Sequence, residues 1–98
     1  MEISVVDVPE RHQYEARTAD GTVAGFAAYS PLGSVLVMTH TEVDPAYEGH
    51  GIGSTLIQGA LDDIRAHGRT VRPDCPFVQA FLARHPDYQD LAVDPGRV

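Results

Sequence analysis

The sequence predicts an α+β fold with a mixed, mainly antiparallel sheet and the element order β-β-β-β-α-β-α. Two observations lead to this prediction. Short alternating or β-branched segments, separated by turn residues, fill the chain up to Val43. From Gly53 onward the apolar residues recur with helical spacing, and a short strand and a second helix follow. We expect residues 1–98 to form a single domain, because a chain of this length supports one core.

The first half of the chain is predicted to form strands joined by short turns. The four expected strands are Ile3–Val6, Tyr14–Thr18, Thr22–Tyr29 and Ser34–Val43. The pair Asp20-Gly21 is typical of a hairpin turn, and Ser30–Gly33 is the next predicted turn. These strands therefore form an antiparallel meander.

The strand Ser34–Val43 has the clearest alternation. Because alternate residues of a strand share a face, His40 and Glu42 are expected on the same face as Leu36 and Met38.

The second half is predicted to hold two helices around one short strand. The first helix begins near Gly53, and its apolar face consists of Leu56, Ile57, Ala60, Leu61 and Ile64. Gly68 ends it, and Arg69–Arg72 is the strand.

The second helix begins at Pro76, with Asp74 or Cys75 as its cap, and ends at His85-Pro86. Its predicted apolar face is Phe77, Val78, Phe81 and Leu82. The tail, Asp87–Val98, is expected to be a turn and a frayed end, with Tyr88 docking it onto this helix.

The charge balance excludes some classes of function. The net charge is −7, and arginine and histidine are the only basic side chains, because lysine is absent. The chain thus lacks the basic surface of a nucleic-acid-binding protein and cannot use lysine in Schiff-base chemistry.

The chain has no apolar run long enough for a membrane helix and no secretory leader at Met1–Ser4. A single cysteine favours a cytoplasmic location, and no histidine or cysteine spacing indicates a metal site.

The segment Ala46–Ser54 carries three glycines at alternate positions, Gly49, Gly51 and Gly53, between the clearest strand and the clearest helix. Glycine lets the backbone approach a ligand closely, and the free amides of a helix N-terminus attract anions. Together they predict a diphosphate site, to which the Ser54 hydroxyl adds a donor. The alternative is a strand-to-helix turn without a ligand. The spacing is that of neither the dinucleotide fingerprint nor a P-loop.

In this segment the sequence resembles the acetyl-CoA motif of the GNAT N-acetyltransferases, Gln/Arg-x-x-Gly-x-Gly/Ala. Gly51 and Gly53 fill its glycine positions, whereas Glu48 stands where Gln or Arg is usual. Further likenesses to small single-domain members are His40–Val43, Cys75–Val78 and Arg84–Tyr88. The resemblance implies a minimal GNAT fold without the helices between the first two strands, and hence an open acceptor site.

The resemblance also implies where acetyl-CoA binds. The fourth and fifth strands should splay apart, with the pantetheine arm pairing with the backbone at Glu42 and Val43. The diphosphate should lie on the amides from Gly49 to Ser54, and His50, inside the same loop, either contacts a phosphate or faces solvent. The residues expected to bind CoA are Glu42, Val43, Gly49, His50, Gly51, Ile52, Gly53 and Ser54.

Acyl transfer to an amine needs a base, and three residues are candidates for chemistry. His40, on an otherwise apolar strand face, is suited to be the base or is a structural histidine. Glu42 is either a surface charge at the end of the strand or a second candidate base. Cys75 lies where amides at a helix N-terminus, together with Arg72, would lower the pKa of a thiol. It could accept the acyl group, position CoA or simply fill the core.

The sequence therefore predicts an acetyl-CoA-dependent N-acetyltransferase acting on an unknown amine. The alternatives are a CoA-binding module without catalysis and a thioesterase-like activity through Cys75. No nucleic-acid or membrane partner is expected, and an open acceptor site allows completion by a second copy in a homodimer.

Overall fold

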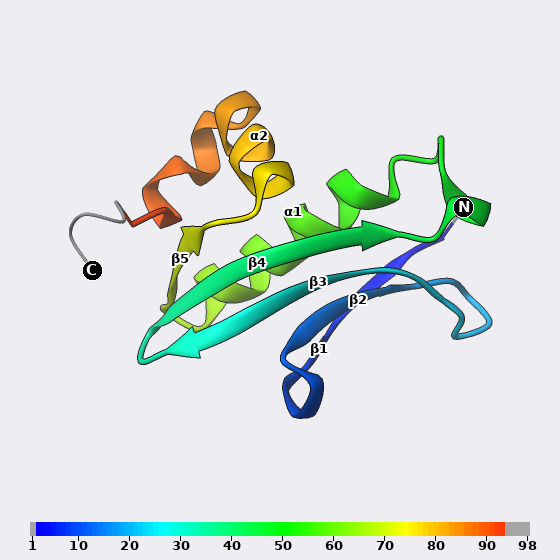
Figure 1. Ribbon diagram of the computed structural model, residues 1–98, viewed down its shortest axis with the longest axis horizontal. Helices are drawn as coiled ribbons and strands as arrows, with labels where there is room; N and C mark the ends of the chain where they lie inside the picture. The colour runs from blue at the N-terminus through cyan, green and yellow to red at the C-terminus, as the bar shows by residue number, and fades with distance from the viewer. Residues whose placement is uncertain (1, 94–98) are drawn as a thin grey trace.

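The computed structural model of the chain describes residues 2–93 (Figure 1). In these residues five strands form one sheet in the order β1-β2-β3-β4-β5: β1 (Ser4–Val8), β2 (Gln13–Arg17), β3 (Val23–Leu32), β4 (Val35–Val43) and β5 (Thr70–Pro73). Strands β1 to β4 are antiparallel neighbours, and β5 runs parallel to β4. The two α-helices are α1 (Ile52–Ala66) and α2 (Pro76–Arg84), and the 3-10 turns are η1 (Pro9–Arg11), η2 (Pro45–Tyr47) and η3 (Pro86–Leu91). The predicted α+β class and element order are confirmed.

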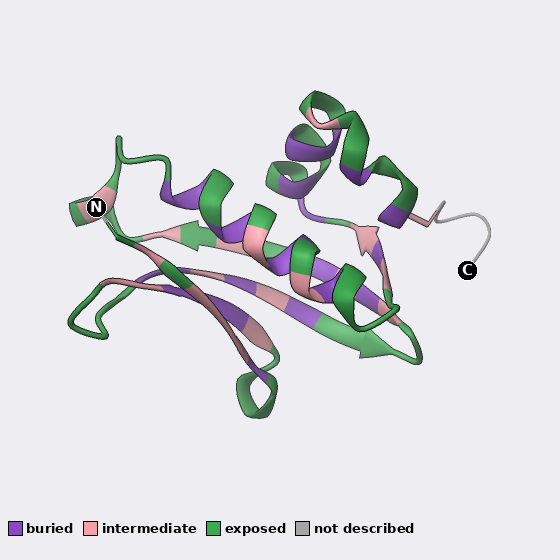
Figure 2. Ribbon diagram, turned by 180° about the vertical axis from the view of Figure 1, so that it is seen from behind, coloured by how far each residue is buried: buried purple, intermediate pink, exposed green. Residues whose placement is uncertain are grey.

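Helix α1 covers one face of the sheet, and the core lies between them. Its buried side chains include all five that the helical spacing predicts: Leu56, Ile57, Ala60, Leu61 and Ile64. Helix α2 packs against α1 and the β4–β5 end of the sheet. Among the described residues, no helix lies across the other face of β1–β4 (Figures 1 and 2). We call this second face the open face.

Strands β4 and β5 separate partway along their length. Their parallel pairing ends at Met38 and Pro73, and one further bond joins the Cys75 amide to the Met38 carbonyl (2.9 Å). The chain then turns away into α2, while β4 continues to Val43. Within residues 2–93 the stretch Thr39–Val43 therefore has no strand on its β5 side, which confirms the predicted splay.

A β-bulge in β4 overturns the predicted side-chain alternation. Ala28 pairs with His40 whereas Tyr29 pairs with Met38, so Thr39 is an extra residue in β4. One inserted residue makes every later side chain of the strand point to the opposite face of the sheet from the one that strict alternation predicts. His40 therefore lies on the open face and not with the buried Met38, which shares the α1 face with Thr41. Glu42 follows His40 onto the open face.

The turn predicted at Ser30–Gly33 is also shifted. Strand β3 continues through Leu32, which pairs with Val35, and the two-residue turn is Gly33-Ser34. Gly33 has a φ of 61°. A two-residue hairpin turn needs such a positive φ, which explains why the glycine and not the proline sets the turn.

The second helix differs from its prediction in one residue. Val78, Phe81 and Leu82 are buried as expected, but Phe77 is 41% exposed. Cys75 is the N-cap, yet its side chain makes no capping hydrogen bond.

Tyr88 docks η3 as predicted and also reaches α1. Its ring lies 5.8 Å from that of Phe81, and its hydroxyl donates to Asp62 (2.7 Å). The tail predicted at Asp87–Val98 is not frayed up to Val93, whose amide donates to the Val71 carbonyl (2.8 Å). Residues 94–98 lie outside the described residues.

Candidate functional site

The glycine loop turns the chain from β4 into α1 through two left-handed residues. Gly49 has a φ of 84° and Gly51 a φ of 69°, conformations that residues with a Cβ rarely adopt. Gly51 is the N-cap of α1 and offers no side chain to its first amides. The first turn of α1 therefore keeps donors without a side-chain cap, which is the arrangement that binds anions at helix N-termini.

A hollow of about 250 Å³ opens beside this loop, and we call it the loop hollow. It is lined by Val43, Tyr47, Glu48, Gly49, Gly51, Ile52, Gly53, Ser54 and Phe77. Most of the residues expected to bind CoA are thus brought together. Glu42 and the exposed His50 do not line it.

Phe77 forms one wall of the loop hollow, a position that sequence reasoning missed. A Cβ placed on Gly53 would lie 2.6 Å from the Cζ atom of Phe77, so this ring packs directly on the glycine. We expected Phe77 in the core because it fits the helical spacing of α2. An exposed aromatic residue beside a glycine of the opposite helix could not be inferred from spacing alone.

A second hollow of about 230 Å³ continues between α1 and α2, and we call it the helix hollow. It is lined by Ser54, Phe77, Ala80, Phe81, Arg84 and His85. It shares Ser54 and Phe77 with the loop hollow, so the two adjoin. Arg84 is the cation of this extended groove, and sequence reasoning gave it no role of its own.

The candidate catalytic residues fall on the two faces of β4. On the open face, His40 Nε2 lies 3.4 Å from Glu42 Oε2, and both side chains are about 60% exposed (61% and 62%). The His40 ring lies 6.0 Å from that of Phe26.

Cys75 lies on the opposite side of β4. Its sulfur is 3.4 Å from Thr41 Oγ1, and the residue is only 3% exposed. The structure thus pairs His40 with Glu42 but does not bring Cys75 to them. The Arg72 guanidinium, which we expected to act on Cys75, donates instead to Asp74 (3.0 Å).

A family model described as GCN5-related N-acetyltransferase matches residues 13–91. The chain belongs to this family. GCN5-related N-acetyltransferases (GNATs) take the acetyl group from acetyl-CoA, and the splayed β4–β5 pair with a glycine loop agrees with that fold. The predicted GNAT fold is confirmed.

Two curated relatives support this assignment. The chain is 43% identical over 61 residues to the N-alpha-acetyltransferase RimI of Mycobacterium tuberculosis, covering 58% of this chain and 38% of RimI. It is 33% identical over 82 residues to the protein NATD1 of Bos taurus, covering 78% of this chain and 68% of NATD1. The chain therefore spans little more than a third of the length of RimI.

A solved structure matches as well. A GNAT-family N-acetyltransferase from Escherichia coli, in complex with CoA, superposes with a TM-score of 0.56 at 28% identity. The match covers 76% of this chain and 48% of that one.

Residues 2–93 hold no helix long and apolar enough to span a bilayer, and no group of three or more metal-ligating side chains.

Proposed function

We propose that this chain is an acetyl-CoA-dependent N-acetyltransferase acting on an amine, with residues 1–98 as one catalytic domain. The observation that carries the proposal is the position of the loop hollow. It lies against the uncapped N-terminus of α1 and includes Val43, at the end of the unpaired stretch of β4. One ligand with a diphosphate and an extended amide-bearing arm fits both features.

CoA would be held mainly by the backbone. The pantetheine amides would pair with β4 at Glu42 and Val43, and the diphosphate would accept from amides between Gly49 and Ser54. The adenosine end would continue into the helix hollow, where Arg84 supplies a positive charge for a phosphate.

The acetyl group would then lie beside the unpaired stretch of β4, close to the His40–Glu42 pair. An alkyl amine is mostly protonated at neutral pH and must lose a proton before it attacks. With Nε2 directed at Glu42, His40 has Nδ1 free to take that proton. The amine nitrogen bonds to the thioester carbon and the C–S bond breaks. The surplus proton of that nitrogen passes to the departing sulfur, so CoA leaves as the thiol, and the proton taken earlier passes from His40 to solvent.

Direct attack by the amine fits the geometry of Cys75 better than a two-step route does. A nucleophilic thiol must reach the thioester, whereas this sulfur is buried against Thr41. We therefore assign Cys75 to packing against β4, beside Thr41, and not to bond making.

One observation favours the alternative of a CoA-binding module without catalysis. Only the 3-10 turn η1 separates β1 from β2, so no helix between these strands covers an acceptor.

The test combines calorimetry with acetyl-CoA and a thiol-release assay with amines. We expect binding, and release of CoA thiol that depends on the amine. Binding without thiol release for any amine would favour the module. An acetyl adduct on Cys75 in intact-mass spectra, lost in Cys75→Ala, would favour the two-step route instead.

We further propose a cytoplasmic location, where a free Cys75 stays reduced. A net charge of −7 argues against nucleic-acid or anionic-membrane partners. A homodimer that completes the open acceptor site is part of the proposal, and analytical ultracentrifugation tests it.

A further inference from the structure

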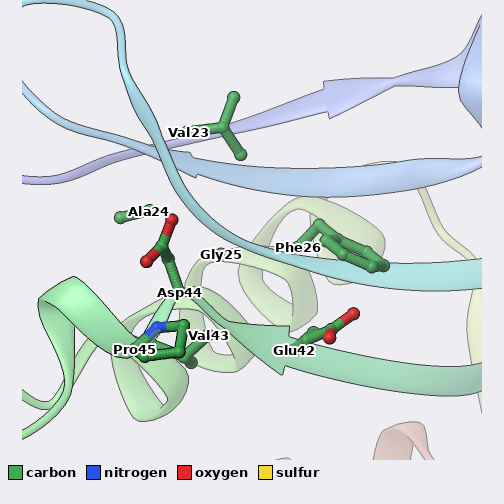
Figure 3. A pocket seen from close by; sticks show the side chains of 8 residues that line it. All are labelled: Val23, Ala24, Gly25, Phe26, Glu42, Val43, Asp44 and Pro45. Atoms are coloured by element: carbon green, nitrogen blue, oxygen red, sulfur yellow. The ribbon is translucent and has the colours of Figure 1, made fainter.

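A third hollow, of about 260 Å³, lies where β3 begins and β4 ends, and we call it the β3–β4 hollow (Figure 3). It is lined by Val23, Ala24, Gly25, Phe26, Glu42, Val43, Asp44 and Pro45. Apolar side chains thus form most of its wall, with two carboxylates among them. Figure 3 shows Phe26 and Glu42 side by side, and the Asp44 carboxylate beside Ala24. Val43 belongs to both this hollow and the loop hollow.

The two carboxylates have no arginine partner within residues 2–93. Asp44 Oδ1 accepts from the Ala46 amide (2.9 Å), and the ionic neighbour of Glu42 is His40. On the neighbouring strand β2, Arg17 pairs with Val23 of the hollow. Its guanidinium is turned to the buried Glu15 instead (2.8 Å).

The hollow therefore combines an apolar wall with uncompensated negative charge. A ligand that suits it has an alkyl portion, which packs on Val23 and Phe26, and a positively charged group, which pairs with the carboxylates. An anionic or wholly apolar ligand would leave the carboxylates unpaired.

The hollow also lies within the reach of one extended ligand from His40, the proposed base. Asp44 directly follows β4 and stands four residues after His40. A strand rises about 3.3 Å per residue, so the Cα atoms of the two residues lie roughly 13 Å apart. Glu42 stands between them. A ligand that spans this stretch could hold one nitrogen in the hollow and present another to His40.

We propose that the β3–β4 hollow binds the distal cationic group of the acceptor, and that the acceptor is an aliphatic amine with a second positive charge. A diamine is the simplest member of this class. One ammonium pairs with Glu42 and Asp44, the alkyl chain lies on Val23 and Phe26, and the second amine is the one acetylated. This assignment rests on the proposed acetyltransferase function.

The first test measures binding without acetyl-CoA. 1,8-Diaminooctane and its single-amine counterpart octylamine are titrated into the methyl-labelled protein, and the methyl resonances of Val23 and Val43 are followed by NMR. We expect saturable shifts with the diamine and a weaker affinity for octylamine.

Asp44→Asn removes one charge but keeps an oxygen that can accept from the Ala46 amide. It should raise the Kd for the diamine about threefold to fivefold, as expected for an exposed ion pair. The matched control is Asp20→Asn, which removes the same charge from the β2–β3 turn, outside this hollow. It should leave the Kd unchanged. Equal affinity for both amines, or an equal effect of both variants, overturns the proposal.

The second test adds acetyl-CoA and measures thiol release. Asp44→Asn should raise the KM for the diamine by a similar factor, while kcat and the affinity for acetyl-CoA are kept. Methyl shifts without acetylation of any amine would leave the hollow as a cation site and reject the proposed function. Acetylation of octylamine and the diamine with equal kcat/KM would support the proposed acetyltransferase function and overturn the assignment of the hollow as a cation site. A basic peptide acetylated at its N-terminus in preference to the diamine would overturn the diamine assignment.

Discussion

The loop hollow and the β3–β4 hollow meet at Val43, yet they are built from different parts of the chain. The loop hollow depends on backbone conformation, since Gly49 and Gly51 hold positive φ angles and the first amides of α1 lie next to them. The β3–β4 hollow depends on side chains, which face outward because Thr39 is inserted in β4. A site made of backbone tolerates changes of side chain if the glycines remain. A site made of side chains can change its ligand by single substitutions.

The largest effect is expected for Gly51→Asp in the loop. An aspartate there must adopt a φ near 69° and carries a negative charge toward the proposed diphosphate. A like charge about 4 Å away costs about 4 kcal/mol at an effective dielectric constant of 20, so acetyl-CoA affinity should fall by about 100-fold or more. Isothermal calorimetry measures this loss.

Gly33→Asp is the matched control, because Gly33 also has a positive φ and, as at Gly51, no atom lies within 4 Å of where a Cβ would be. It should lose similar stability but keep its affinity for acetyl-CoA. If both variants lost the same affinity, the loop would act through folding alone and the anion site would be wrong.

The next largest effect is expected for a substitution of His40 on the open face. His40→Gln should lower kcat by about 100-fold, the lower range for removal of a general base, with the Kd for acetyl-CoA unchanged. Stopped-flow measurement of thiol release with saturating amine reports it. His67→Gln, at the far end of α1, controls for the loss of an exposed histidine. An unaltered kcat in His40→Gln would transfer the role of base to Glu42 or to water.

The difference between the two regions also explains what the sequence could predict. Helix α1 and its glycine loop follow from periodic apolar residues and from glycine, which are local properties. The bulge at Thr39 depends on how β4 pairs with β3, a contact between distant segments, and strict alternation therefore put His40 and Glu42 on the wrong face. The β3–β4 hollow could not be foreseen for the same reason. Phe77 had the spacing of a core residue, and only the approach of Gly53 fixes it at the surface.

A third prediction concerns the buried carboxylate of Glu15. Glu15 is 1% exposed and accepts hydrogen bonds from Arg17 and Gln13. The Arg17 guanidinium holds the pKa of Glu15 below its usual value, against the opposing effect of burial. Glu15→Gln should cost about 1–3 kcal/mol of unfolding free energy at pH 7, as expected when a buried charged hydrogen bond is lost. Urea denaturation measures this cost.

The pH dependence of that cost has a definite sign. Because the pKa of Glu15 is lower in the folded state, its contribution is complete above the unfolded value of about 4.3 and is lost as the pH falls through the folded value. The difference between wild type and Glu15→Gln should therefore shrink below about pH 4. Glu10→Gln, an exposed substitution in η1, serves as the control. A difference that stayed constant down to pH 3 would show that Glu15 acts through packing and not through its charge.

The smallest effect is expected for Glu48→Gln, which makes the wall of the loop hollow neutral. Glu48 is exposed, so its repulsion of a bound diphosphate is partly screened and should be worth about 0.5–1 kcal/mol. Acetyl-CoA should therefore bind about twofold to fivefold more tightly, and the gain should shrink as salt is raised. Glu2→Gln removes a similar exposed charge outside the loop hollow and should change the affinity less. A weaker affinity in Glu48→Gln would mean that this carboxylate holds the loop in shape, and that the side chains of the loop matter as much as its glycines.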